Sequence, residues 1–88
     1  GDVDRLKKYI GIMEGRKNAI YGDIQQAKDS LRSDINDINK ILENLKVKMD
    51  ISKAKAPFNR KIKQLRKVKR DILEQIEDLD YLLAEMDE

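Results

Sequence analysis

Apolar residues recur along the first third of the chain at alternating steps of three and four. This spacing places them on one face of a helix and is the heptad pattern of coiled coils. A single charged residue, Lys17, interrupts the stripe. Its members are Val3, Leu6, Ile10, Met13, Lys17, Ile20, Ile24, Ala27 and Leu31.

The stripe changes its rhythm after Leu31. The next apolar residue is Ile35, which gives two successive steps of four, and alternation then resumes through Ile38, Leu42, Leu45 and Met49. Two steps of four form a stutter, which locally unwinds a left-handed supercoil. The alternative is an imperfect amphipathic helix. Both interpretations predict a helix over residues 2–50.

Three glycines, Gly11, Gly15 and Gly22, lie inside this predicted helix. Each weakens it by up to about 1 kcal/mol relative to alanine, and together they could divide it in two. The apolar phase nevertheless continues through all three, which a loop would have no reason to preserve. We therefore predict one continuous helix with a soft N-terminal half.

Pro57 marks the start of a second helix. Proline disfavours helical backbone at the preceding residue and suits the first turn of a new helix. We expect a connection over 51–56 and a helix over 57–87, with the regular stripe Phe58, Ile62, Leu65, Lys69, Ile72, Ile76, Leu79, Leu83 and Met86. The fold predicted is all-α, a long antiparallel helical hairpin of coiled-coil type. A single rod kinked at Pro57 is the alternative.

Apolar residues beside the second stripe indicate further helical neighbours. Val68, Leu73 and Leu82 fall at e and g positions, which a strict two-stranded coil would expose and a three- or four-helix bundle would cover. The second helix is also too short to cover the first before about Asn18. We predict a homo-oligomer, most simply a dimer, or packing with another helical protein, through Val3, Leu6, Ile10, Met13, Ile24, Leu31, Ile38, Leu45, Leu65, Ile72, Ile76, Leu79 and Leu83.

Composition argues against catalysis. The 88 residues contain neither cysteine nor histidine, so the thiol nucleophile, the usual general base and the commonest metal ligand are missing. We find no phosphate-binding glycine loop and no paired carboxylates in a plausible pocket. We expect no enzymatic activity, no cofactor, no metal site and no small-molecule substrate. The first residue is Gly1 rather than methionine, which is compatible with a single helical domain over 1–88 cut from a longer protein.

Hydropathy and cysteine usage are the features of the sequence that concern cellular location. The longest apolar runs have three or four residues, too short for a membrane span, and no signal peptide is visible. The absence of cysteine fits an intracellular protein, either cytoplasmic or associated with nucleic acid.

Charge in the second helix is divided between its two halves. Nine bases and no acid lie in 53–70, and eight acids and no base lie in 71–88. This order opposes the helix macrodipole and places like charges four residues apart, as at Lys63 and Lys67. Local helix stability therefore cannot be the reason for it, and an external partner is implied.

Three partners would explain the charge division. One is an antiparallel copy of the second helix, centred between Arg70 and Asp71; its attraction would be long-range and salt-sensitive, because few of the charges occupy e or g. Another is an anionic membrane surface contacted by Phe58, Ile62, Leu65 and Val68. The third is nucleic acid, bound through phosphates by Lys53, Lys55, Arg60, Lys61, Lys63, Arg66, Lys67 and Arg70.

Two smaller features carry alternatives. Asp34 and Asp37 are one turn apart and could share a cation, or they are polar spacers between Ile35 and Ile38. Lys17 and Lys69 on the stripes could fix register, or extend outward to solvent. The sequence as a whole predicts an assembly or scaffolding module acting through helix packing. A helical arm that binds nucleic acid is the alternative.

Overall fold

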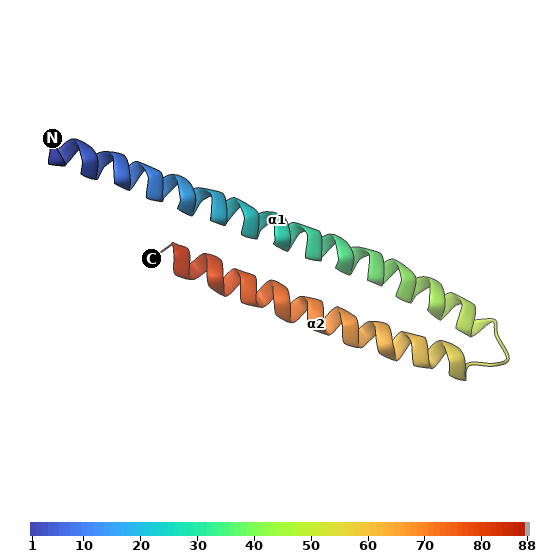
Figure 1. The fold of residues 1–88 in the computed structure, drawn as a ribbon. Coiled ribbons are helices and arrows are strands. Elements are labelled where there is room, and N and C mark those ends of the chain that lie inside the picture. Colours follow the sequence, from blue (N-terminus) through green and yellow to red (C-terminus); the bar gives the residue numbers. More distant parts are fainter. Residues whose placement is uncertain (88) are drawn as a thin grey trace.

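The computed structural model describes residues 1–87, which form two long helices and no strand. Helix α1 spans Asp2–Asp50, the bounds expected for the first helix. Helix α2 spans Ala56–Met86 and begins one residue earlier than expected. The two helices pack side by side and antiparallel (Figure 1). The predicted hairpin is confirmed, and the kinked rod is excluded.

The connection between the helices is closed by hydrogen bonds to the end of α1. The Met49 carbonyl oxygen accepts from the Ser52 backbone N–H at 3.1 Å and from Lys55 Nζ at 3.0 Å. The Ser52 hydroxyl accepts from the Ala54 N–H at 3.2 Å. Lys55 thus gives the Met49 carbonyl a second hydrogen bond and complements the negative end of the helix dipole. Pro57 then lies in the first turn of α2.

Helix α1 runs without a break through all three of its glycines. None of them has a positive φ, and a Cβ added to Gly11, Gly15 or Gly22 would meet no atom within 4 Å. The glycines are therefore required neither by backbone conformation nor by close packing. The prediction of a continuous first helix is confirmed.

The molecule is an extended rod with a thin core. It measures 80 × 15 × 14 Å, and its radius of gyration is 21.6 Å, compared with about 12 Å for a compact domain of this length. Its accessible surface is 7260 Å², compared with about 5,400 Å² for a compact monomer of this mass. No large side chain among the described residues is fully buried. Fourteen large apolar side chains are 43% exposed or more.

The core is a single row of side chains between the helices. Ile38, Leu42 and Ile62 form its most buried cluster, with partly buried residues packed around them. On α2 the buried and half-buried positions are Phe58, Ile62, Leu65, Lys69, Ile72, Ile76, Leu79, Leu83 and Met86, which are the residues of the predicted stripe. The predicted inner face of the second helix is therefore confirmed in full.

The inner face of α1 differs from the prediction near its start. Tyr21 and Lys28 face α2, whereas Ile20 and Ala27 are exposed. With Lys28 in place, steps of four and three alternate regularly from Tyr21 to Met49, so the predicted stutter is wrong. The Lys28 side chain is 13% exposed and forms an ion pair with Asp80. This ion pair allows a lysine to occupy the inner face.

Candidate assembly surface

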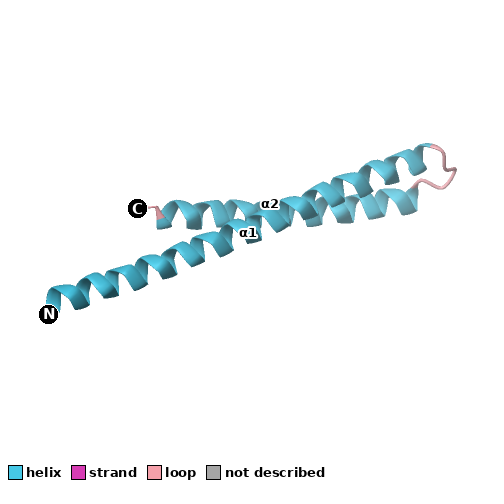
Figure 2. Ribbon diagram, turned by 90° about the horizontal axis from the view of Figure 1, so that it is seen from above, coloured by secondary structure: helices cyan, strands magenta, loops and turns pink. Residues whose placement is uncertain are grey.

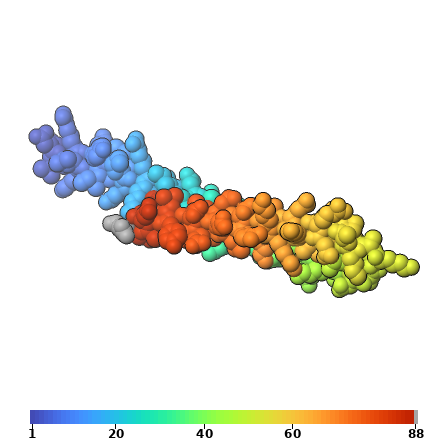
Figure 3. Space-filling model, turned by 90° about the horizontal axis from the view of Figure 1, so that it is seen from below, coloured from blue at the N-terminus to red at the C-terminus, as the bar shows by residue number. Residues whose placement is uncertain are grey.

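Residues 2–20 of α1 extend beyond the end of α2. Figures 2 and 3 show this N-terminal overhang projecting past the C-terminal end of the hairpin. Every residue in it is exposed, including large apolar ones. The exposed fractions on its predicted stripe are 65% for Val3, 61% for Leu6, 52% for Ile10 and 43% for Met13. The overhang therefore presents an uncovered apolar stripe.

Heptad letters relate this stripe to the packed part of the hairpin. Positions a and d face the other helix: in α1 they fall at Tyr21 and Ile24, in α2 at Ile62 and Leu65, and they repeat every seven residues. The e positions flank this inner face on one side of the hairpin and the g positions flank it on the other. The two sides differ sharply in composition.

The g side of the hairpin is apolar and the e side is polar. Five of nine g positions carry apolar residues, against one of nine e positions, namely Leu73. The large ones at g are half exposed, from 44% for Leu82 to 52% for Ile20. Only the g side is suited to receive another helix. Its apolar members are Ile20, Ala27 and Ile41 from α1 with Val68 and Leu82 from α2.

Two shallow grooves run between the helices on the g side. The middle groove is lined by Ala27, Ser30, Leu31, Gln75, Asp78 and Leu79. The tip groove, nearer the connection, is lined by Ile41, Leu45, Lys61, Gln64, Leu65 and Val68. Both are bordered mainly by apolar surface, so they are suited to side chains of a helix lying along the hairpin.

The d and g positions of α1 form one continuous line, which we call the outer stripe. It begins on the overhang and continues along the edge of both grooves, where the d residues also contact α2. The predicted stripe from Val3 to Leu31 is its N-terminal part. Its members are Val3, Leu6, Ile10, Met13, Lys17, Ile20, Ile24, Ala27, Leu31, Asp34, Ile38, Ile41, Leu45 and Lys48.

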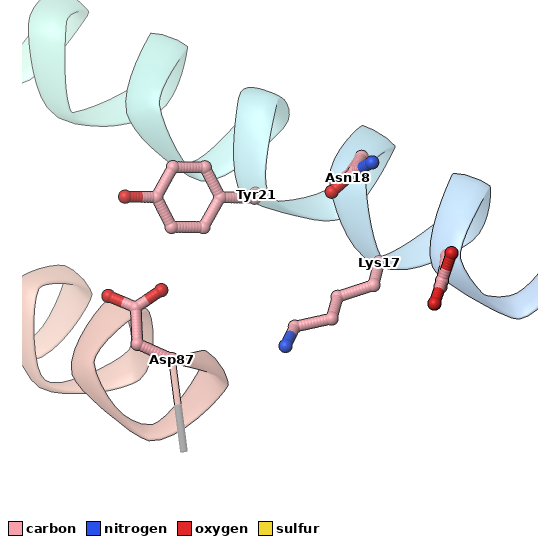
Figure 4. A pocket seen from close by; sticks show the side chains of 5 residues that line it. Lys17, Asn18, Tyr21 and Asp87 are labelled. Atoms are coloured by element: carbon pink, nitrogen blue, oxygen red, sulfur yellow. The ribbon is translucent and has the colours of Figure 1, made fainter.

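A polar pocket separates the overhang from the packed hairpin. It is lined by Glu14, Lys17, Asn18 and Tyr21 from α1 and by Asp87 from the end of α2. In Figure 4 the Lys17 and Asp87 side chains reach into the space between the helices from opposite sides. Among residues 1–87, no acidic side chain forms an ion pair with Lys17. The pocket holds no combination of groups that suggests a reaction.

The thirteen predicted interface residues fall into two groups. Those of the overhang are exposed, as described above. The others lie on the inner face of the hairpin, where Ile24, Ile38 and Leu83 are buried and Leu31, Leu45, Leu65, Ile72, Ile76 and Leu79 are half-buried. Packing within the chain accounts for the second group, although Leu31, Leu45, Leu65 and Leu79 also line the grooves.

The predicted nucleic-acid contacts are all exposed and are concentrated towards the connection. They are Lys53, Lys55, Arg60, Lys61, Lys63, Arg66, Lys67 and Arg70. Lys55 caps α1, and Lys61 lines the tip groove. Helix α2 has no acid in its first turn and no base in its last, so its charges do oppose the macrodipole.

Two other interpretations find little support. Three of the four apolar residues suggested for a membrane surface, Phe58, Ile62 and Leu65, lie on the inner face, where Ile62 is only 5% exposed; Val68 is exposed on the g side. Within the described residues, no helix has the length and hydropathy needed to cross a membrane. Residues 1–87 contain no group of three or more potential metal ligands, so Asp34 and Asp37 have no further ligand beside them.

Comparison of the chain with protein-family models, with curated proteins and with solved structures found no match. The geometry and chemistry of the chain itself are therefore the basis for assigning a function.

Sequence reasoning missed the role of Lys28 and its partner Asp80. Charge excluded Lys28 from the apolar stripe, and the small apolar Ala27 took its place. One signal was available, because a regular heptad from Ile24 to Ile35 requires position 28 and not position 27. Regularity of spacing was the better guide here than the hydrophobicity of single residues.

Proposed function

We propose that this chain is a non-enzymatic assembly module that self-associates through the outer stripe of α1. The observation that carries the proposal is the apolar stripe of the overhang, which none of residues 1–87 covers and which continues in phase onto the g side of the hairpin. Exposed apolar surface of this extent marks an interaction site.

The energetics favour association. Covering a large side chain that is half exposed or more stabilises by about 1 kcal/mol, and a symmetric dimer counts each such residue twice. The thin core of the single hairpin leaves little stability of its own. A second copy supplies the missing apolar partner without requiring any other protein.

Sedimentation equilibrium of two matched variants tests the proposal. Ile10 and Ile12 are 52% and 49% exposed, and both lie in the overhang, away from α2. Ile10 belongs to the outer stripe, whereas Ile12 lies on the opposite face of α1. We expect wild-type and Ile12→Lys proteins to be dimers at micromolar concentration, and Ile10→Lys to dissociate. A monomeric wild type at high micromolar concentration would refute the proposal.

The basic residues near the connection support a second candidate, binding to nucleic acid. The hairpin brings Lys46 and Lys48 of α1 close along the rod to the bases of 53–63 in α2. Such a cluster can neutralise several phosphates, which gives a steep dependence of affinity on salt. Phe58, the one aromatic nearby, is half-buried, so stacking on bases is not favoured.

Binding to duplex DNA and RNA at two salt concentrations tests this candidate. Changing Arg60, Lys63 and Lys67 to Glu, which are exposed and line neither groove, should weaken binding by at least tenfold at low salt and leave the dimer intact. Absence of binding at low salt would remove the candidate.

A further inference from the structure

We propose that two copies associate through antiparallel α1 helices in one register, centred between Gln25 and Gln26, in which Lys17 meets Asp34 of the other copy. This inference rests on the assembly function proposed above and specifies its geometry. The occupant of the outer stripe is thus the outer stripe of a second, identical chain.

The symmetry of the outer stripe carries the inference. In an antiparallel pair, each d residue lies opposite a g residue of the partner helix. Pairing about the point between Gln25 and Gln26 matches every member of the stripe with another member, and at the two ends Val3 lies opposite Lys48. The matched pairs include Ile10 with Ile41, Ile20 with Leu31, and Ile24 with Ala27. This point also lies at the middle of α1, which spans Asp2–Asp50. The helices therefore overlap along their whole length.

Lys17 and Asp34, the two charged residues inside the outer stripe, select this register; the third charged residue, Lys48, lies at the end of the stripe opposite Val3. Lys17 and Asp34 carry opposite charges and lie equally far from the centre. Lys17 of each copy therefore lies opposite Asp34 of the other copy. Shifting the register by one heptad in one direction places Lys17 opposite Ile41 and Asp34 opposite Ile24. Shifting it the other way places them opposite Ala27 and Ile10. Each shifted register leaves at least two unpaired charges per chain against apolar residues, compared with one per chain, Lys48 at the end of the stripe, in the proposed register, at a cost in stability.

A second pair beside the stripe agrees with the first. Arg16 and Asp37 occupy c positions, which flank a contact made by d and g residues. In the proposed register, Arg16 of one copy lies across from Asp37 of the other, and Asp23 lies across from Ser30. The shifted registers instead bring Asp23 against Asp37 or against its own copy. Asp34 and Asp37, which belong to no group of three or more potential metal ligands in residues 1–87, thus lie opposite Lys17 and Arg16 of the other copy.

The same register fills both grooves on the g side. The overhang of one copy lies along the half of the other hairpin nearest its connection. Ile10 and Leu6 come opposite Ile41 and Leu45, which line the tip groove. Ile20 comes opposite Leu31, which lines the middle groove. The result is a three-helix section at each end of the dimer, in which the exposed residue Val68 gains a neighbour.

A register centred on the charge boundary of α2 fits less well. Lys28 and Asp80 lie at one level in the hairpin. Ten residues later in α1 and ten residues earlier in α2, Ile38 lies level with Arg70. A dimer centred between Arg70 and Asp71 would therefore bring Asp37 beside its own copy and leave both overhangs uncovered. Its advantage is the attraction between basic and acidic halves, whereas the register proposed here brings the acidic ends of the two α2 helices near each other.

Engineered cysteines distinguish these registers, because the natural chain has none. We expect an equimolar mixture of Lys17→Cys and Asp34→Cys chains to form a cross-linked heterodimer on mild oxidation. Lys17→Cys mixed with Ile41→Cys, the matched control for a one-heptad shift, should not. Arg70→Cys alone reports the alternative centre, since its two copies would lie about 36 Å apart in our register. Cross-linking of the control or of Arg70→Cys, without 17–34 cross-linking, would overturn the register while leaving the assembly function intact.

Charge reversal gives a second measurement. We expect Lys17→Asp and Asp34→Lys each to raise the dimer dissociation constant roughly tenfold, because each change removes two ion pairs and creates two repulsions. The double reversal should restore most of the affinity. Asp87→Asn is the control, because Asp87 shares the polar pocket with Lys17 and has no role in the register. If the double reversal is as weak as the sum of the single changes, the Lys17–Asp34 contact does not exist.

Discussion

The ion pair between Lys28 and Asp80 yields a prediction whose sign depends on which partner is changed. The Lys28 side chain occupies an a position and is 13% exposed, whereas Asp80 is 50% exposed at an e position. Both Lys28→Met and Asp80→Asn abolish the ion pair. We expect Lys28→Met to stabilise the hairpin and Asp80→Asn to destabilise it.

The magnitudes follow from the unequal burial of the two groups. An ion pair with one half-exposed partner is worth less than about 1 kcal/mol, because solvent screens it. Lys28→Met loses that amount and gains the burial of an apolar side chain of similar length, worth about 1.5–3 kcal/mol. The net expectation is a gain of about 1 kcal/mol. Asp80→Asn leaves a lysine on the inner face without its counter-charge and should cost up to about 1 kcal/mol.

Thermal and urea unfolding followed by circular dichroism measure both changes. A change of 1 kcal/mol shifts the melting temperature of a domain of this size by about 4–8 °C. Measurements at several protein concentrations separate hairpin stability from association, because only association depends on concentration. If Lys28→Met lowers the melting temperature as much as Asp80→Asn does, the ion pair outweighs apolar burial and the reasoning is wrong.

Three further predictions concern the core, the glycines and the connection. Ile62→Ala removes the most buried side chain and should cost about 2–3 kcal/mol in unfolding free energy, whereas Val47→Ala on the outer face should cost less than about 0.5 kcal/mol. Gly15→Ala and Gly22→Ala should each stabilise α1 by up to about 1 kcal/mol and raise its helical ellipticity, since the added Cβ meets open space; lower stability would indicate a contact made only in the assembly. Lys55→Met should lower the unfolding free energy by about 0.5–1 kcal/mol through loss of its bond to the Met49 carbonyl, and no change in a urea titration would show that this bond contributes nothing.

Most of the hairpin could be predicted from spacing and one proline. The regular stripe from Phe58 to Met86 identified the inner face of α2 completely, because steps of four and three that alternate over that length keep every member on one face of a helix. Pro57 placed the start of α2 to within one residue. The unbroken apolar phase through Gly11 and Gly22 was a better guide to the continuous helix than their low helix propensity.

The inner face of α1 was harder to predict because two apolar stripes share its d positions. One stripe, formed by a and d, packs against α2, and the other, formed by d and g, is the outer stripe. From Val3 to Leu31 the more hydrophobic line is the outer one; from Leu31 to Met49 it is the inner one. A stripe traced by hydrophobicity alone therefore passes from the outer stripe to the inner one at Leu31. The resulting irregularity has the spacing of a stutter, although it marks a helix with two apolar faces.

The difference between the two sides of the hairpin has a consequence for the size of the assembly. A rod with apolar association surfaces on both sides can add copies without limit and form sheets or fibres. Here the e side is polar except for Leu73, so in the proposed assembly each chain has one side, the g side, suited to association. A contact in which each α1 lies against its own copy uses the same surface on both chains and leaves no adhesive flank free. In the dimer proposed above, growth would then end at two chains, and the polar e side would prevent the rods from forming a filament.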